Sequence, residues 1–332
     1  MATQIWTPLD YDKPGKQIGH LNLPHSVHRS AYGNIVIPLG IVANGTGPTL
    51  LLTAGTHGDE YEGQVALTRL LRDIDPAAIN GRLIILPMLN APAARAGLRV
   101  SPVDGVNLNR AFPGDPLGSP TQAIAHYVSS VLFPLADVYQ DLHAGGSSLD
   151  YLPFVSVRAS VDADLDAKAL AAARAFGAPY IQVWGYSPDP RLSTAESNRQ
   201  KIISLGGEFG GGGSVSRRGL GIVERGLQRL MAHLGMIAPL DETPPTPAIE
   251  VEVKGRDHYV YAAGNGLFEP LCDLGDHVEA GQTCGLLHDP DDPTRPAIPH
   301  HFATSGLLIC RRHPGRAERG DCVAHLATPR RR

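Results

Sequence analysis

The chain has 332 residues, of which 42% are hydrophobic, and its formal net charge is -4. This hydrophobic content is ordinary for a packed globular core. A slightly acidic chain lacks the clustered Lys and Arg that phosphate binding needs, so we expect no nucleic-acid partner. No apolar run reaches the roughly eighteen residues of a membrane span, and we expect no membrane association. The length predicts two domains, or one large domain with an appendage.

The N-terminus and the cysteines bear on the cellular compartment. The opening segment, MATQIWTPLDYDKPGK, lacks the basic and apolar stretches of a secretion signal, so we expect a cytoplasmic protein. The cysteines have long spacings without a C-x-x-C pair, which argues against a zinc ribbon and against a disulfide scaffold. We expect buried, reduced thiols at Cys272, Cys284, Cys310 and Cys322.

The first two thirds of the chain alternate short apolar runs with segments of helical spacing. This alternation predicts an α/β fold with a largely parallel sheet and helices on both faces. The expected strands cover 49–53, 82–87, 137–142 and 201–205. The expected helices cover 62–74, 121–135, 162–176 and 215–234.

The pattern changes after a polar, Pro-rich segment at 239–247, which suits a stiff linker. Beyond it, short runs with period two are separated by Gly and Pro turns, which predicts a small all-β domain. The turns at 275–281 and 319–323 are similar to those of lipoyl-like barrels, although the modified lysine of such carriers is missing. We therefore expect an α/β domain at 1–238, a linker at 239–248 and an all-β domain at 249–329.

Three polar clusters follow predicted strands, where open α/β sheets bind ligands. His57 and Glu60 are three residues apart, so both can face one point from a turn that opens a helix. His143, just beyond the strand at 137–142, would complete a His, Glu, His set. Such a set holds a catalytic zinc and leaves a position for water. The alternatives are an exposed capping turn for the first pair and a core histidine for His143.

Two carboxylates could assist such a metal. Asp141 lies on the same side of its strand as His143, which it could orient as a hydrogen-bond acceptor. Glu208 lies within a glycine run at 206–213. Glycine weakens strands and helices, so this loop suits close backbone approach. Glu208 is a candidate for the base that takes a proton from water, with a solvated loop carboxylate as the alternative.

A fourth cluster, at 107–114, predicts substrate binding. Asn109 and Arg110 lie together in an irregular segment, and Arg110 can hold a carboxylate with two parallel hydrogen bonds. Arg99 lies ten residues before Asn109 and could polarise a scissile carbonyl. A surface salt bridge is the alternative for both arginines.

Together these residues resemble the succinylglutamate desuccinylase and aspartoacylase family, a branch of the zinc-carboxypeptidase fold. The family pattern of H-x-x-E, N-R, a strand-ending D-x-H and a glutamate followed by Gly is present in order. The resemblance covers nearly the whole chain and implies a mixed, mostly parallel sheet, with an all-β domain after it. It implies one Zn²⁺ per chain on His57, Glu60 and His143, carboxylate binding by Asn109 and Arg110, and Glu208 as general base.

The resemblance also implies a reaction, the hydrolysis of the amide bond of a small N-acyl amino acid. The segments at 57–63, 107–114, 149–154 and 208–214 resemble those of a deacetylase within this family, which implies the deacetylation of Nα-acetyl-L-2,4-diaminobutyrate in ectoine degradation. The ammonium of such a substrate needs an acidic partner, for which the candidates are Asp150, Asp104 and Glu62. Tyr259 or Tyr261 could reach the pocket, and core or surface positions are the alternative.

Three other functions stay open at this point. The protein could remove a succinyl or another acyl group, or it could be a metallocarboxypeptidase, although a covering β-domain would restrict access for long peptides. It could also be a binding protein that keeps the fold without catalysis. Zinc is preferred over manganese or cobalt on ligand type and availability. A homo-oligomer is compatible with the sequence.

Overall fold

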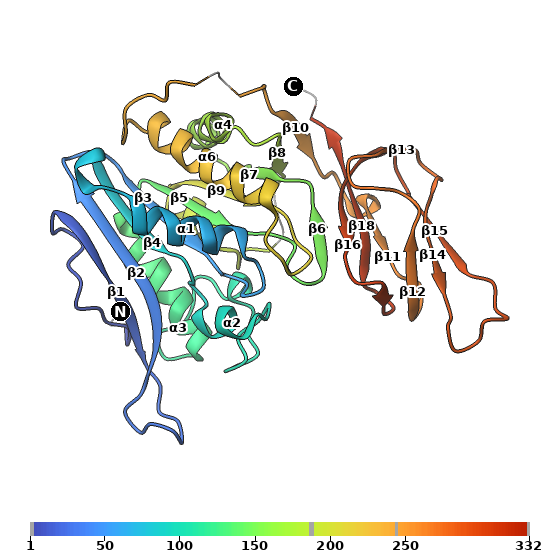
Figure 1. The fold of residues 1–332 in the computed structure, drawn as a ribbon, viewed down its shortest axis with the longest axis horizontal. Coiled ribbons are helices and arrows are strands. Elements are labelled where there is room, and N and C mark those ends of the chain that lie inside the picture. Colours follow the sequence, from blue (N-terminus) through green and yellow to red (C-terminus); the bar gives the residue numbers. More distant parts are fainter. Residues whose placement is uncertain (1–2, 186–188, 243–244, 331–332) are drawn as a thin grey trace.

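The computed structural model describes residues 3–185, 189–242 and 245–330. Residues 243–244 of the expected linker therefore lie outside the described residues. The expected α/β fold is confirmed. Figure 1 shows helices packed around strands in one part of the molecule, and a second part made of strands at the C-terminal end of the chain.

One mixed sheet organises the first part of the chain. Its strands are β1 (Gly15–Pro24), β2 (Asn34–Asn44), β3 (Thr49–Ala54), β4 (Gly81–Leu86), β5 (Val138–Leu142), β6 (Leu149–Tyr151), β7 (Phe154–Arg158), β8 (Tyr180–Trp184) and β9 (Ile203–Glu208). The central strands β4, β3, β5 and β9 are parallel neighbours in that order. Antiparallel pairing of β7 with β9, and of β2 with both β1 and β4, makes the sheet mixed.

The helices cover both faces of this sheet, as expected. They are α1 (Glu62–Asp73), α2 (Ala91–Ala96), α3 (Pro120–Tyr127), α4 (Ala163–Phe176), α5 (Ser193–Arg199) and α6 (Arg217–His233). Helix α3 continues as a π-helical turn at Val128–Leu132 and a short 3-10 turn at Phe133–Leu135, so the predicted helix at 121–135 changes its winding along its length. Figure 1 shows α1, α4 and α6 lying near one another, away from α3.

The apolar run of β3 explains why it lies at the centre of the sheet. All six of its residues are buried. Leu50 and Leu52 join the core under α1, α4 and α6, while Leu51 joins the core with α3 on the other face. A strand buried on both faces suits the interior of a parallel sheet. Its carboxyl end, together with that of β5, therefore opens at the edge where α/β sheets bind ligands.

The C-terminal part of the described chain contains β10 (Ile249–Glu252), β11 (Tyr259–Tyr261), β12 (Gly266–Pro270), β13 (His277–Val278), β14 (Thr283–His288), β15 (Ile298–His301), β16 (Gly306–Arg312), β17 (Arg316–Ala317) and β18 (Cys322–Pro329). Strands β15, β14, β12 and β17 form a separate antiparallel sheet. Strand β10 pairs in parallel with β8 and antiparallel with β18, and β16 pairs with β6. The large sheet thus continues into the C-terminal part.

Two expectations about the whole chain can be compared with this fold. Within the described residues all four cysteines are free, and Cys272, Cys284 and Cys310 are buried as predicted, whereas Cys322 is partly exposed. None of the helices in the described part of the chain has the length and apolar character needed to cross a membrane.

Candidate metal centre and active-site cavity

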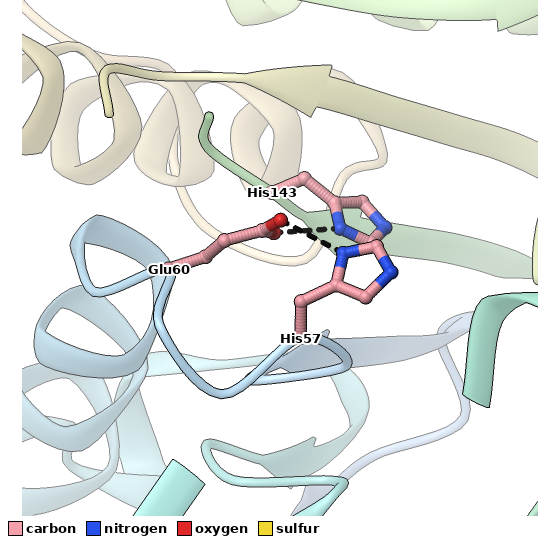
Figure 2. Close-up of side chains that lie close together, drawn as sticks. All are labelled: His57, Glu60 and His143. Atoms are coloured by element: carbon pink, nitrogen blue, oxygen red, sulfur yellow. Dashed lines mark hydrogen bonds and ion pairs between the residues drawn. The ribbon is translucent and has the colours of Figure 1, made fainter. Parts of the chain in front are cut away.

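His57, Glu60 and His143 converge at the carboxyl ends of β3 and β5. Figure 2 shows both imidazoles turned toward the Glu60 carboxylate. Nδ1 of His57 lies 2.8 Å from Oε1 of Glu60, and Nδ1 of His143 lies 2.8 Å from Oε2. One potential ligand atom from each of the three buried residues lies within 4.8 Å of the others. Residues far apart in the sequence therefore form one group that could bind a metal ion.

The far side of each imidazole is held by another polar group. Nε2 of His143 lies 2.9 Å from Oδ2 of Asp141, and Nε2 of His57 lies 3.1 Å from Oδ1 of Asn107. Because both acceptors favour a proton on Nε2, the Nδ1 lone pairs are left directed at the shared point. The structure thus places Asp141 where the sequence predicted it. Asn107 was not singled out, because an Asn in a polar loop carries no distinctive signal.

Asp141 is itself fixed by a buried network. Oδ1 accepts hydrogen bonds from the hydroxyls of Thr53 at 2.7 Å and Thr56 at 2.9 Å, and Oδ2 accepts one from Ser193 at 3.0 Å. Burial would raise the pKa of Asp141, but the charge of His143 and these hydrogen bonds hold it below its usual value. The carboxylate therefore stays ionised and keeps its neighbouring imidazole in place.

Burial and neighbouring charges shift the pKa values of Glu60 and His143 in opposite directions. Burial would raise the pKa of Glu60, but the two imidazoles hold it below its ordinary value. Burial would likewise lower the pKa of His143, but the carboxylates of Asp141 and Glu60 raise it well above its ordinary value. The carboxylates thus create a strong preference for positive charge between these side chains, which a divalent cation can supply.

Glu208 lies at the end of β9, beside the metal-binding group. His143 N donates to the carbonyl of Gly207 at 3.0 Å, and Phe209 N donates to the carbonyl of His143 at 3.0 Å. Among the described residues, no hydrogen-bond partner is found for the buried Oε2 of Glu208. Burial, with the charge of Glu60, raises the pKa of Glu208 well above its ordinary value. A carboxyl group with a raised pKa is suited to both accept and donate a proton during a reaction.

The glycine run after Glu208 packs directly on another backbone segment, as its composition predicted. The carbonyl of Gly210 accepts hydrogen bonds from Gly145 N at 2.9 Å and Tyr151 N at 3.2 Å. At Gly211, which has φ +156°, a Cβ would lie 2.1 Å from the carbonyl oxygen of Leu149. Glycine at 211 is therefore needed both for its conformation and for the close approach of the two segments.

The three remaining residues that the sequence singled out lie around the same cavity. Nη1 of Arg99 is 3.4 Å from Oε1 of Glu60. Nδ2 of Asn109 is 3.5 Å from Nε2 of His143. Arg110 donates from Nη1 to the carbonyl of Asn109 at 2.7 Å, and its Nε lies 3.2 Å from Oδ2 of Asp189. The local fold therefore brings Arg99, Asn109 and Arg110 to the cavity that the candidate metal ligands and Glu208 also line.

A cavity of about 530 Å³ joins these residues. Its volume is in the range that small-molecule sites occupy. Tyr259, from the C-terminal part of the chain, lines the cavity, whereas the side chain of Tyr261 is half exposed to solvent. Other lining residues include Tyr151, Phe154, Arg158, Trp184, Thr194 and Ser204.

Comparison with known proteins identifies the family. Residues 46–234 match the family model described as the succinylglutamate desuccinylase/aspartoacylase catalytic domain. The chain belongs to this family. It is 40% identical over 324 residues to the N-alpha-acetyl-L-2,4-diaminobutyric acid deacetylase of Halomonas elongata, covering 97% of this chain and 94% of that protein. The resemblance predicted from the motifs is confirmed.

Solved structures of this succinylglutamate desuccinylase/aspartoacylase family share the fold over almost the full length. The product-bound ectoine utilization protein EutE (DoeB) of Ruegeria pomeroyi superimposes with a TM-score of 0.95 at 38% identity, over 99% of this chain and 100% of that chain. A succinylglutamate desuccinylase/aspartoacylase of Rhodobacter sphaeroides gives a TM-score of 0.94 at 39% identity, with the same coverage of both chains.

The three acids considered for a substrate ammonium lie elsewhere in this family member. Asp104 accepts hydrogen bonds from the backbone and hydroxyl of Thr121, and the fully buried Glu62 accepts one from Ser216 N. Asp150 lies in β6, where it pairs with β16. Within the described part of the chain, the acidic side chains that line the cavity are Glu60 and Glu208.

Proposed function

We propose that the protein is a zinc-dependent amidohydrolase that converts Nα-acetyl-L-2,4-diaminobutyrate to 2,4-diaminobutyrate and acetate. The convergence of His57, Glu60 and His143 beside the unpartnered carboxylate oxygen of Glu208, as described above, carries the proposal. The substrate is supported by the relative from Halomonas elongata, which is named for this deacetylase activity.

The donor set fits a catalytic zinc. Two imidazole nitrogens and one carboxylate oxygen are ligands that zinc prefers, and three protein ligands leave a position for water or substrate. The hydrogen bonds that the far imidazole nitrogens donate to Asp141 and Asn107 support the orientation that ligation needs. When bound, zinc lowers the pKa of water to about 7 and polarises a carbonyl group. We expect about one ion per chain.

The chain's own residues would then carry the proton and the developing charge. Oε2 of Glu208 would accept a proton from a water molecule as the water oxygen forms a bond to the acetyl carbon. The same carboxyl would deliver that proton to the amide nitrogen as the C–N bond breaks, which its raised pKa favours. Arg99, which lines the cavity beside Glu60, would donate a hydrogen bond to the oxygen that gains negative charge.

The rest of the cavity supports a small substrate that carries a carboxylate. Asn109 and Arg110 would bind the substrate carboxylate, since an amide and a guanidinium donate paired hydrogen bonds to such a group. Tyr259 closes one wall from the C-terminal part, which supports a small substrate over the end of a long peptide. A metallocarboxypeptidase activity is therefore the weaker proposal.

Metal analysis combined with acyl release tests the function. We expect the purified protein to retain about one zinc per chain and to release acetate from Nα-acetyl-L-2,4-diaminobutyrate faster than from N-acetylaspartate. The panel should also hold Nα-succinylglutamate and a dipeptide. Faster succinate release would replace the proposed acyl group, and zinc without any hydrolysis would leave only a metal-binding protein.

A further inference from the structure

Arg158 is a cavity residue that the motifs did not reveal. It ends β7 and lines the same cavity as the metal-binding group. Its Nε and Nη1 atoms are buried, and in the described chain neither has a hydrogen-bond partner. Buried charged groups are ordinarily paired, so two unsatisfied guanidinium nitrogens in a residue that lines a cavity indicate a ligand that completes them.

The charged side chains that act on Arg158 are one of each sign, Arg110 and Asp189. Burial lowers the pKa of Arg158, and the positive charge of Arg110 lowers it further, while Asp189 acts in the opposite direction. Asp189 is already shared, because Nε of Arg110 lies 3.2 Å and Nε of Arg191 lies 3.0 Å from its carboxylate oxygens. Two neighbouring guanidiniums thus depend on one carboxylate that a third arginine also contacts.

The acids on the cavity wall do not supply the missing negative charge. Among the described lining residues they are Glu60, which is engaged by two imidazoles, and Glu208. Phe154, at the start of β7, pairs with Glu208, so Arg158 lies four residues further along that strand. At roughly 3.3 Å per residue this is about 13 Å, a separation that an arginine side chain and a short substrate span together.

We infer that Arg158 and Arg110 together form a carboxylate subsite, in which Arg158 is a substrate-binding residue. The inference rests on the proposed function, which supplies a substrate with a carboxylate. A guanidinium can place two N–H groups on the two oxygens of one carboxylate, and Nε with an Nη is such a pair. Its position in a sheet strand makes Arg158 a rigid element of specificity.

The test compares substrates with and without the carboxylate. Arg158→Gln should lower kcat/KM about 10- to 100-fold for Nα-acetyl-L-2,4-diaminobutyrate, since hydrogen bonds to a charged group are lost. It should leave kcat/KM for N-acetyl-1,3-diaminopropane, the same molecule without its carboxylate, nearly unchanged. N-Acetylaspartate, whose side chain carries a second carboxylate, is the third substrate. If Arg158→Gln loses more kcat/KM with N-acetylaspartate than with Nα-acetyl-L-2,4-diaminobutyrate, Arg158 binds the side-chain carboxylate. If the two losses are equal, Arg158 binds the α-carboxylate.

Two further variants keep the test interpretable. Arg158→Lys retains the charge without the paired donors and should lose less than Arg158→Gln. Arg69→Gln, which removes an arginine paired with Glu224 on the surface, should match the parent protein. An equal loss for substrates with and without the carboxylate, or no loss at all, would overturn the subsite.

A binding measurement separates this inference from the proposed function. Calorimetry on the zinc-loaded protein compares 2,4-diaminobutyrate with 1,3-diaminopropane, which lacks the carboxylate. Arg158→Gln should weaken only the binding of 2,4-diaminobutyrate, by about 10- to 100-fold. If the parent protein hydrolyses no N-acyl amino acid but Arg158→Gln still weakens only the binding of 2,4-diaminobutyrate, the proposed deacetylase function is refuted and the carboxylate subsite is kept. An active parent protein without the difference would refute the subsite alone.

Discussion

At the scale of single residues, hydrogen bonds decide which imidazole nitrogens face the candidate metal position. Asp141 and Asn107 each engage an Nε2 atom and leave Nδ1 of His143 and His57 beside Glu60. The same arrangement shows why a carboxylate two residues before His143 has a role, because alternate residues of a strand share one face.

The first prediction concerns Asp141→Asn. The amide keeps the size of the side chain but loses the charge that holds His143, and its NH₂ group can donate where an acceptor is needed. We expect about a 10- to 100-fold loss in zinc affinity or in activity, measured by metal content after dialysis and by acetate release. Asp137→Asn is the matched control, since Asp137 precedes the same strand and accepts from Thr49 N. Unchanged zinc affinity and activity in Asp141→Asn would contradict this role.

The second prediction separates proton transfer from metal binding. Glu208→Gln keeps the shape of the side chain but cannot accept a proton. We expect zinc content near that of the parent protein and a kcat lower by about 100- to 10,000-fold. Substantial zinc loss would place Glu208 among the ligands, and full activity would remove it as the base.

At the scale of secondary structure, helix α6 packs against the loop that follows Glu208. Gly219, in the first turn of α6, is packed against the loop so closely that a Cβ would lie 1.6 Å from the carbonyl oxygen of Phe209. Gly221, two residues later, has no atom within 4 Å of the corresponding position. One helix thus offers a glycine required by packing and a glycine that packing does not require.

The third prediction compares alanine at these two glycines. Gly219→Ala must push α6 from the loop, so we expect a loss of about 1–3 kcal/mol in the free energy of unfolding and a large fall in activity. Gly221→Ala should raise the free energy of unfolding by about 0.5–1 kcal/mol and keep activity, because alanine favours the helix. Chemical denaturation and acetate release measure both effects. Equal stability of the two variants would show that the packing at Gly219 is looser than described.

The elements also show what sequence patterns could and could not predict. The segments at 49–53 and 137–142 predicted β3 and β5, and every residue of both strands is buried. Period two at 249–253 predicted the strand observed as β10, but periodicity carries no information on the pairing partners of a strand, which include β8. The hairpin β1–β2 was not predicted, since its partly exposed faces mix polar and apolar residues.

The candidate site was predictable to a similar degree. His57, Glu60, His143 and Glu208 are polar groups at strand ends or in a glycine run, where folding alone gives little reason for them. Arg158 was missed because β7 was not predicted, so its strand-end position could not be recognised. Its unsatisfied nitrogens depend on contacts from distant segments, which no local pattern encodes.

At the scale of the whole molecule, the C-terminal part completes the cavity through stacked rings. Tyr259 lines the cavity and stacks on His325 with ring centroids 4.3 Å apart and 7° between the planes. His325 also stacks on Trp184 of β8, with ring centroids 6.3 Å apart. His325 therefore contacts a residue of the first part and a residue of the C-terminal part.

This position makes His325 sensitive to acid. Burial, with a smaller contribution from the charge of His258, lowers the pKa of His325 to about 3. No hydrogen-bond partner of its Nε2 is found within the described ranges. In the unfolded chain the pKa of a histidine is about 6.5, so the unfolded state binds the proton first. The neutral ring thus contributes stability above about pH 6.5 that is lost as the pH falls toward 3.

The fourth prediction follows from the lowered pKa of His325, which makes the folded protein less stable in acid. Between pH 7.5 and pH 5 the parent protein should lose about 2 kcal/mol in the free energy of unfolding through this one ring, and His325→Gln should not show this part of the loss. Denaturant titrations at both pH values measure it, and comparison with the variant cancels the acid-induced loss of metal common to both. His277→Gln, at an exposed position of β13, is the control and should keep the parent pH dependence. An identical acid dependence in His325→Gln would mean that the ring reaches water or a proton acceptor in the folded protein, so that the stack between the two parts opens in solution.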